Sequence, residues 1–276
     1  MIYYTSVDKK FKGDNMKSKL MKVFRFILVV IIIGCLVILG KRFYDYRTNA
    51  KNNQYIESVL NKVDEEEPSE EENPDASVAD DDAAWDKKEK KFMKVVDELK
   101  AQNSDVVGFI EIPALNIAYP LLKGPDNDFY LRKGLNKQYD IAGSIFIDAN
   151  NAGDLNDDNT VIYGHHLEID SMFTRLHELR DQKFAEEHRE IYITSEDGLR
   201  EYEIFAVFGT PAGYDYRTLG FRYPEEKINY FNKLKANSEV SLNTDDFTGD
   251  SKIITLSTCE YDYDDQRLAV QAVRVK

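Results

Sequence analysis

The amino-acid sequence predicts a mostly β protein: a closed eight-stranded barrel with an N-terminal helix and two inserted helices, preceded by a transmembrane helix. Short apolar or alternating segments recur between residues 106 and 273, and turns rich in Pro, Gly, Asn and Asp separate them. Amphipathic helical periodicity occurs just before these segments and between them. An apolar run near the N-terminus is long enough to cross a bilayer.

The charge of the chain is unevenly distributed. The formal net charge of −14 argues against nucleic-acid binding, because no basic face is available to neutralise phosphates. Residues 1–63 carry +8, residues 64–82 carry −11 and the remainder carries −11. We therefore expect these segments: a basic cytoplasmic N-terminus (1–22), a transmembrane signal anchor (23–40), a stalk and acidic disordered linker (41–84) and an extracellular folded domain (85–276).

The membrane assignment depends on the run from Val23 to Gly40, which is apolar except for Arg25. As a helix it rises about 27 Å, close to the thickness of the hydrocarbon core. Six lysines precede it, so the positive-inside rule places the N-terminus in the cytoplasm and the folded domain outside the cell. The alternative is a cleaved signal peptide, but KRFYDYR follows the run in place of a small-residue cleavage site.

The segment from Asp64 to Asp82, DEEEPSEEENPDASVADDD, contains eleven acidic residues, two prolines and no aromatic residue. Such a composition cannot bury enough apolar surface to fold. We expect an extended linker that holds the following domain away from the membrane. A cation-binding tail is the alternative interpretation.

Three helices are expected in the folded domain. In WDKKEKKFMKVVDELKAQ the apolar residues Phe92, Val95, Val96 and Leu99 recur at helical spacing and predict a helix that packs on the domain. The other two are inserted between strands: IDSMFTRLHEL (169–179), with Asp170 or Ser171 as N-cap, and PEEKINYFNKLKANS (224–238), with Pro224 at its start.

Eight segments are expected to be strands: VVGFIEI, NIAYPLL, AGSIFID, NTVIYGH, EIYIT, LREYEIFAVF, SKIITLSTC and RLAVQAV. Strands of this length and number suit a closed barrel, which leaves no exposed sheet edge.

Cys259 ends the strand KIITLSTC. Alternation places it on the same face as Ser257, at the rim of the barrel. The other cysteine, Cys35, lies in the apolar run, so Cys259 is an unpaired thiol outside the reducing cytosol. A buried inert cysteine is the common alternative. A reactive thiol needs a base or a positive charge beside it to form thiolate.

His165 and His166 follow Gly164 at the end of the strand NTVIYGH, again at a rim, whereas His177 and His188 are expected on the surface. A metal site with Glu168 and Asp170 is an alternative use of the histidine pair, although the spacing matches no strong ligand pattern.

Arg267 opens the final strand, across a hairpin connection from Cys259. Its guanidinium could favour thiolate and hold an oxyanion. Pairing with Asp262, Asp264 or Asp265 in its own loop is the alternative. Together, Cys259, His165 and Arg267 form a constellation suited to acyl transfer.

From about residue 85 to its end the chain resembles the sortase family, class B. TLSTC followed eight residues later by Arg267 resembles the family's active-site strand and arginine, and IYGHH resembles the motif of the catalytic histidine. NSDVVGFIEIPALNIAYPLLKGPDNDFYL and AGSIFID resemble the class B entry strands. In many class B members a Met or Asn lies just after the histidine motif, whereas His166 and Leu167 stand there in this chain, which leaves His166 as the alternative to His165.

The resemblance implies a sortase-type barrel and a membrane-anchored cysteine transpeptidase of a Gram-positive surface. Cys259 would form a thioester with a C-terminal sorting motif of a secreted protein, and His165 would act as general acid and base. Arg267 would bind substrate carbonyls and the oxyanion, and Tyr163, Ser257 and Thr258 would line the substrate pocket. The acceptor would be an amine of a cell-wall precursor or of a pilin lysine, and no cofactor or metal is expected. A membrane-tethered thiol hydrolase and a non-catalytic binding module are the alternatives.

Overall fold

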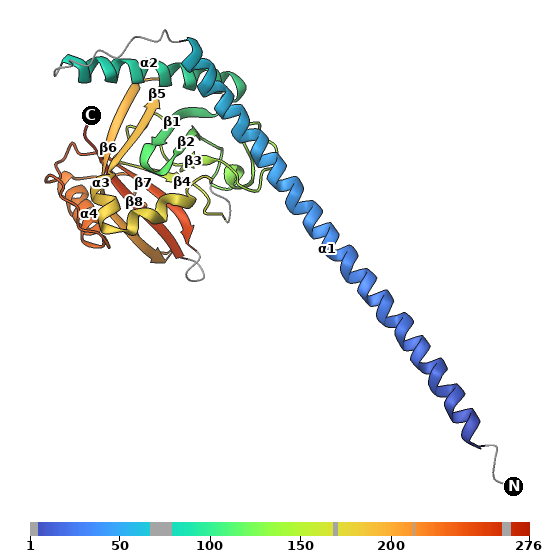
Figure 1. Ribbon diagram of the computed structural model, residues 1–276. Coiled ribbons are helices and arrows are strands. Elements are labelled where there is room, and N and C mark those ends of the chain that lie inside the picture. The colour runs from blue at the N-terminus through green and yellow to red at the C-terminus, as the bar shows by residue number, and fades with distance from the viewer. Residues whose placement is uncertain (1–4, 67–78, 168–170, 212, 261–265) are drawn as a thin grey trace. The chain divides into compact units, whose positions relative to one another are not determined.

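The computed structural model describes residues 5–66, 79–167, 171–211, 213–260 and 266–276 (Figure 1). The contacts divide the chain into two compact units, Met1–Thr48 and Asn49–Lys276. The first unit consists of the N-terminal part of helix α1 (Thr5–Glu66). Its apolar side chains from Val23 to Leu39 are exposed. Within the described residues, α1 is the one helix whose length and composition suit a membrane span.

The second unit begins with the remainder of α1 and with helix α2 (Ala79–Gln102). The expected apolar stripe of α2 is buried against the barrel, where it packs on strand residues such as Phe109. Ile56, Val59 and Val63 of α1 join the same cluster and are also buried. The C-terminal part of the expected stalk is therefore packed on the folded domain. The expected acidic linker lies mostly in residues 67–78, outside the described residues.

The strands close into the predicted eight-stranded barrel (Figure 1), and their order around it is β1-β2-β3-β4-β7-β8-β6-β5. Their bounds are β1 (Val106–Ile112), β2 (Ile117–Leu122), β3 (Ile145–Ile147), β4 (Asn159–Tyr163), β5 (Glu190–Ser195), β6 (Gly198–Pro211), β7 (Ile253–Glu260) and β8 (Gln266–Arg274). β2–β3 and β4–β7 are parallel pairs, and the other neighbours are antiparallel. Closure pairs every strand on both sides.

The largest hydrophobic cluster gathers side chains from all parts of the barrel, including Ile110, Ile193 and Leu256, which are completely buried. On β7 the alternation is regular: Ile254 and Leu256 belong to this cluster, whereas Ile253 belongs to a separate cluster with helix α4 (Pro224–Ala236). β7 is therefore buried on both faces from Ile253 to Thr258.

The helix expected at 169–179 is wrong in type and start. The described chain forms the 3-10 helix η3 (Thr174–Arg180), followed by the short helix α3 (Gln182–Glu187). Met172 has φ of 54°, a left-handed value that no α-helix accommodates, so a helix cannot run through it. Ser171 makes no N-cap, and the other expected cap, Asp170, lies outside the described residues.

The second inserted helix is confirmed as α4, with Pro224 in its first turn. Phe231 and Leu234 are fully buried, as expected, and Ile228 is half-buried. Two short 3-10 helices, η1 (Pro113–Leu115) and η2 (Phe129–Arg132), complete the described elements of the second unit.

Candidate active site

Three adjacent strands, β4, β7 and β8, bring the expected catalytic positions to one end of the barrel. We call them the strand triplet. In the parallel β4–β7 pair Tyr163 lies opposite Ser257, and the Gly164 amide donates to the Ser257 carbonyl at 3.2 Å. His165 comes two residues after Tyr163, and Cys259 comes two residues after Ser257. The backbone register therefore places these two residues at the same end of neighbouring strands.

On the other side of β7, the antiparallel register pairs Cys259 directly with Arg267 of β8. The central strand thus carries the cysteine and β8 carries the arginine, whereas the histidine lies two residues beyond the end of β4. The backbone of Cys259 is described within β7, whereas its side chain is outside the described part. The Arg267 Nη1 donates to the Gln266 carbonyl at 2.9 Å. The alternative partners Asp262, Asp264 and Asp265 lie outside the described residues.

His165 is half-buried and its ring is held by a main-chain carbonyl. Nε2 lies 2.7 Å from the oxygen of Leu131 in η2. A carbonyl only accepts, so Nε2 carries the proton and Nδ1 is the ring atom left to exchange one. The Phe173 amide donates to the His165 carbonyl at 3.1 Å, which fixes the backbone on the other side.

Burial lowers the pKa of His165, because it disfavours the charged imidazolium. The hydrogen bond to the Leu131 carbonyl opposes this effect, and the positive charge of Arg132 reinforces it. The net pKa is below the ordinary histidine value. At neutral pH the imidazole is therefore mainly neutral, and a nearby thiol would supply the proton that charges it.

Gly164 is needed because Phe173 lies against it. A Cβ built on Gly164 would be 2.5 Å from Cδ2 and 2.7 Å from Cγ of the Phe173 ring, which is completely buried. The glycine thus lets the segment that starts η3 pack tightly beneath the histidine.

Tyr163, the residue before Gly164, is anchored by Asp148 just after β3. Its hydroxyl donates to Asp148 Oδ2 at 2.9 Å, and Asn127 Nδ2 donates to the same oxygen at 2.9 Å. Burial and then the Asp148 charge raise the pKa of Tyr163, which keeps it neutral. Burial alone would raise the pKa of Asp148, but these hydrogen bonds and those from Asn150 outweigh it and lower the pKa.

The two other expected pocket residues point in different directions along β7. Ser257 is buried, and its Oγ lies 2.9 Å from the hydroxyl of Tyr216 in the β6–α4 connection. Thr258 is also buried, and its Oγ1 has no hydrogen-bond partner among the described residues. Tyr163 and Ser257 are register partners, so their side chains lie on the same face of the sheet. Thr258 is the next residue of β7, and its side chain therefore points to the opposite face.

The structure adds residues that the sequence did not indicate: Leu131, Asp148, Tyr216 and Arg217. The positive charge of Arg217 acts on Tyr163 and lowers its pKa, against the effects of burial and of Asp148. Leu131 acts through its main-chain carbonyl, which has no signature in the sequence. Asp148 does have one, because it is the polar residue at the end of the expected strand AGSIFID.

His177 is exposed, as expected, and His188 is half-buried. The rings of His166 and His177 are stacked with centroids 5.7 Å apart, which turns His166 toward η3. The alternative metal ligands Glu168 and Asp170 lie outside the described residues. Where the chain is described, no group of three His, Cys, Asp or Glu side chains is placed to hold a metal ion.

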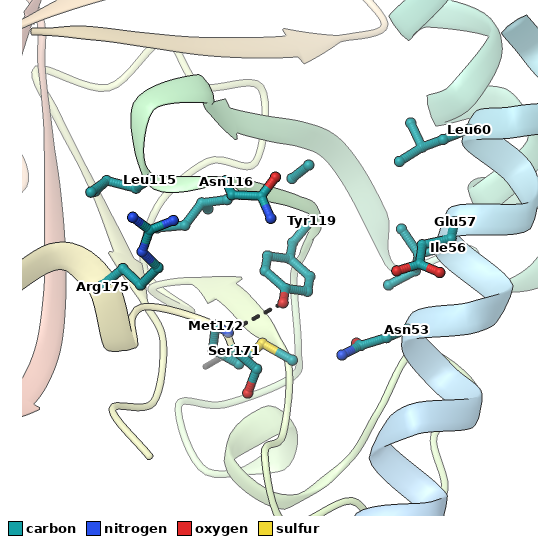
Figure 2. A pocket seen from close by; sticks show the side chains of 12 residues that line it. Asn53, Ile56, Glu57, Leu60, Leu115, Asn116, Tyr119, Ser171, Met172 and Arg175 are labelled. Atoms are coloured by element: carbon teal, nitrogen blue, oxygen red, sulfur yellow. Dashed lines mark hydrogen bonds between the residues drawn. The ribbon is translucent and has the colours of Figure 1, made fainter. Parts of the chain in front are cut away.

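A cavity of about 270 Å³ lies beside this site rather than in it (Figure 2). Its walls come from α1, from the β1–β2 turn and from the start of η3. In Figure 2 Tyr119 and Met172 lie between Asn53 of α1 and Arg175, and the Tyr119 hydroxyl accepts from the Met172 amide at 3.4 Å. The strand triplet contributes none of its lining residues.

Comparisons with known proteins agree with the resemblance. The sortase domain family model matches residues 110–275. Sortase B of Listeria monocytogenes is 37% identical over 178 residues, which cover 63% of this chain and 71% of that protein. The structure of sortase B of Bacillus anthracis in complex with AAEK1 gives a TM-score of 0.66 at 30% identity, and the match covers 85% of this chain and 99% of that one. The Staphylococcus aureus sortase B–substrate complex gives a TM-score of 0.63 at 27% identity and covers 72% and 97%.

Proposed function

Because the chain belongs to the sortase family of cysteine transpeptidases, we propose that it cleaves a C-terminal sorting motif of secreted proteins and transfers the acyl part to an amine. Cys259 is the nucleophile, His165 the general acid and base, and Arg267 the oxyanion ligand. We assign Tyr163, Ser257 and Thr258 to the substrate pocket. The observation that carries this proposal is the register of β7, which sets Cys259 opposite Arg267 and brings it level with His165.

Acylation begins when the Cys259 thiolate attacks the scissile carbonyl, with its proton held on Nδ1 of His165. Arg267 offers fixed donors and a positive charge to the oxyanion that develops. Nδ1–H then protonates the departing amine as the carbon–nitrogen bond breaks, which leaves a thioester and a neutral imidazole.

Deacylation is the reverse sequence with a new amine. The incoming amine attacks the thioester carbonyl, neutral Nδ1 of His165 accepts its proton, and the Cys259 thiolate leaves. Throughout, the Leu131 carbonyl holds Nε2–H, so the ring presents the same nitrogen in both steps.

The cellular setting follows from the apolar part of α1. We infer a single-pass membrane protein with a cytoplasmic N-terminus and an extracellular catalytic domain, since lysines precede the span. Its partners are then secreted proteins that carry the sorting motif. We propose an amine of a cell-wall precursor or of a pilin lysine as the acceptor, because transpeptidation ends with an amine attacking the thioester.

The test uses the full chain in detergent micelles, a panel of sorting-motif peptides and triglycine as the amine probe. We expect a peptide–triglycine amide that depends on Cys259 and on the amine. The Cys259→Ala variant should form none, whereas Cys35→Ser, which changes the other cysteine of the chain, should form it at the original rate.

Three outcomes would contradict the proposal. Cleavage with no amide at any triglycine concentration would indicate a thiol hydrolase with water as acceptor. Cleavage that persists in Cys259→Ala, or a folded chain that binds peptides without cleaving any, would indicate that Cys259 is not a nucleophile.

A further inference from the structure

The carbonyl that holds His165 belongs to a closed loop, residues 130–144, that includes most of η2 and the connection from η2 to β3. We call it the 130–144 loop. The Ser144 amide donates to the Tyr130 carbonyl at 3.1 Å, and the Asp140 amide donates to the Arg132 carbonyl at 3.0 Å. These bonds tie the two sides of the loop together on either side of Leu131. The position of the Leu131 oxygen therefore depends on the closure of the loop.

Gly143 allows this closure. It has φ of +60°, and a Cβ there would lie 2.5 Å from the carbonyl oxygens of both Tyr130 and Leu131. Only a residue without a side chain lets the C-terminal segment of the loop pack directly against these two carbonyls. A small change in the path of the loop therefore moves the Leu131 oxygen directly.

The loop is attached to helix α1 through Asp140, which is 1% exposed. Its Oδ2 accepts from Asn52 Nδ2 at 2.5 Å, and its Oδ1 accepts from Asn49 Nδ2 at 3.4 Å and from the Ala142 amide at 3.0 Å. A buried carboxylate without donors is strongly unfavourable, so these bonds decide where Asp140 lies. Asn52 supplies the shortest of the three.

Asn52 also fits closely against the loop backbone. A Cβ on Gly134 would overlap the Asn52 amide and would lie 3.4 Å from Asp140 Oδ2. The asparagine thus occupies a notch formed by a glycine on one side and a buried carboxylate on the other. Such a fit positions both partners more narrowly than a surface hydrogen bond does.

We propose that Asn52 of α1 is a positioning residue for His165, which acts through Asp140 and the 130–144 loop to set the Leu131 carbonyl. The proposal rests on the proposed role of His165 as general acid and base. It makes the helix that continues from the apolar segment a part of the catalytic unit rather than a tether alone. Asn52 and Asp140 therefore act on His165 through the loop and not as groups that exchange the proton.

The electrostatic consequence has a definite sign. The Leu131 carbonyl raises the pKa of His165 against the effects of burial and of Arg132. If the carbonyl moves away, the imidazolium loses this acceptor and the pKa falls further. The limb of the kcat/KM profile on which the imidazolium is lost as pH rises then moves to lower pH.

The test measures kcat, KM and the pH profile of transpeptidation with the full chain in detergent micelles. For Asn52→Ala and Asn52→Asp we expect about a tenfold fall in kcat, an unchanged KM for the peptide and a limb at lower pH. The exchanged pair Asn52→Asp with Asp140→Asn restores a donor opposite an acceptor and should recover both kcat and the limb. Lys51→Ala, an exposed neighbour on the same helix, should match the unaltered chain.

The proposal is overturned if folded Asn52 variants keep the original kcat and limb, or if the exchanged pair is as defective as the single variants. If the single variants do not fold, the exchanged pair alone decides: recovery supports the proposal, and a folded but defective pair contradicts it. A loss of kcat with an unmoved limb would indicate a structural role alone. Failure of the proposed function is distinguishable, because Cys259→Ala and His165→Ala would then retain activity.

Discussion

His165 is held from two sides, by the strand triplet and by the 130–144 loop, and the two sides differ in kind. In the triplet the residues are positioned by continuous backbone pairing, from Asn159 opposite Ile253 to Tyr163 opposite Ser257. In the loop a single carbonyl is positioned by a glycine, a buried carboxylate and a side chain from a distant helix.

This difference indicates which side-chain substitutions the strand triplet and the 130–144 loop each tolerate. A ladder of main-chain bonds is insensitive to most side-chain changes, so only the chemical groups at its end matter. A loop held by a few side-chain bonds changes position when one of them is lost. In the triplet, activity should therefore depend on the chemical groups of the side chains at the strand ends. In the loop, activity should depend on side-chain contacts that fix the position of the Leu131 carbonyl.

The largest effect after loss of the nucleophile is expected at Arg267. Arg267→Gln should lower kcat/KM about 100-fold to 1,000-fold, because the oxyanion loses its charged donor. Arg267→Lys should recover only part of this, since an ammonium lacks the planar pair of donors. Steady-state kinetics of peptide transpeptidation measures both. Arg274→Gln, at the exposed end of the same strand, is the control, and an equal loss there would remove the special role of Arg267.

Gly164→Ala should have the next largest effect on activity, because Gly164 packs against Phe173 just before η3. The added Cβ overlaps the buried Phe173 ring, so the free energy of unfolding should fall by about 1–3 kcal/mol. The same displacement of His165 should lower kcat up to about 100-fold. Thermal unfolding and kinetics check the two effects. Gly220→Ala has open space around its Cβ and should change neither, and a silent Gly164→Ala would contradict the close packing.

Gly143→Ala tests the loop side with an intermediate effect. The left-handed backbone and the contact with the Leu131 carbonyl should cost about 1–3 kcal/mol of stability. We expect about a tenfold fall in kcat and a move of the imidazolium limb to lower pH, as for Asn52→Ala. If the free energy of unfolding falls while the imidazolium limb does not move, the loop stabilises the fold without affecting the pKa of His165.

Arg132→Gln should have the smallest effect and the opposite sign. The Arg132 charge lowers the pKa of His165, so its removal favours the imidazolium and raises the pKa. The limb of kcat/KM should move to higher pH with little change in the maximum. Arg132→Lys keeps the charge and is the matched control. A shift to lower pH in Arg132→Gln would show that the arginine acts by positioning the loop.

The same contrast explains what the sequence could predict. Alternation in KIITLSTC and the glycine before His165 placed both residues at strand ends, because period and turn chemistry are local properties. The contacts of Asn52 with Asp140 and of Leu131 with His165 join residues far apart in the chain, and neither has a local pattern. The helix expected at 169–179 failed for a related reason, since tertiary contacts hold Met172 in a left-handed conformation. The packing of Ile56 on the barrel was missed because the helix around it is polar.

The most direct test of the central claim is the intact mass of the full chain after brief exposure to the sorting-motif peptides. We predict a mass increase equal to the acyl part of the cleaved peptide, carried by Cys259. It should be present in Cys35→Ser, absent in Cys259→Ala and removed by triglycine with formation of the new amide. An adduct that persists in Cys259→Ala, or peptide cleavage with no adduct on Cys259 in the amine-free reaction, would contradict the account.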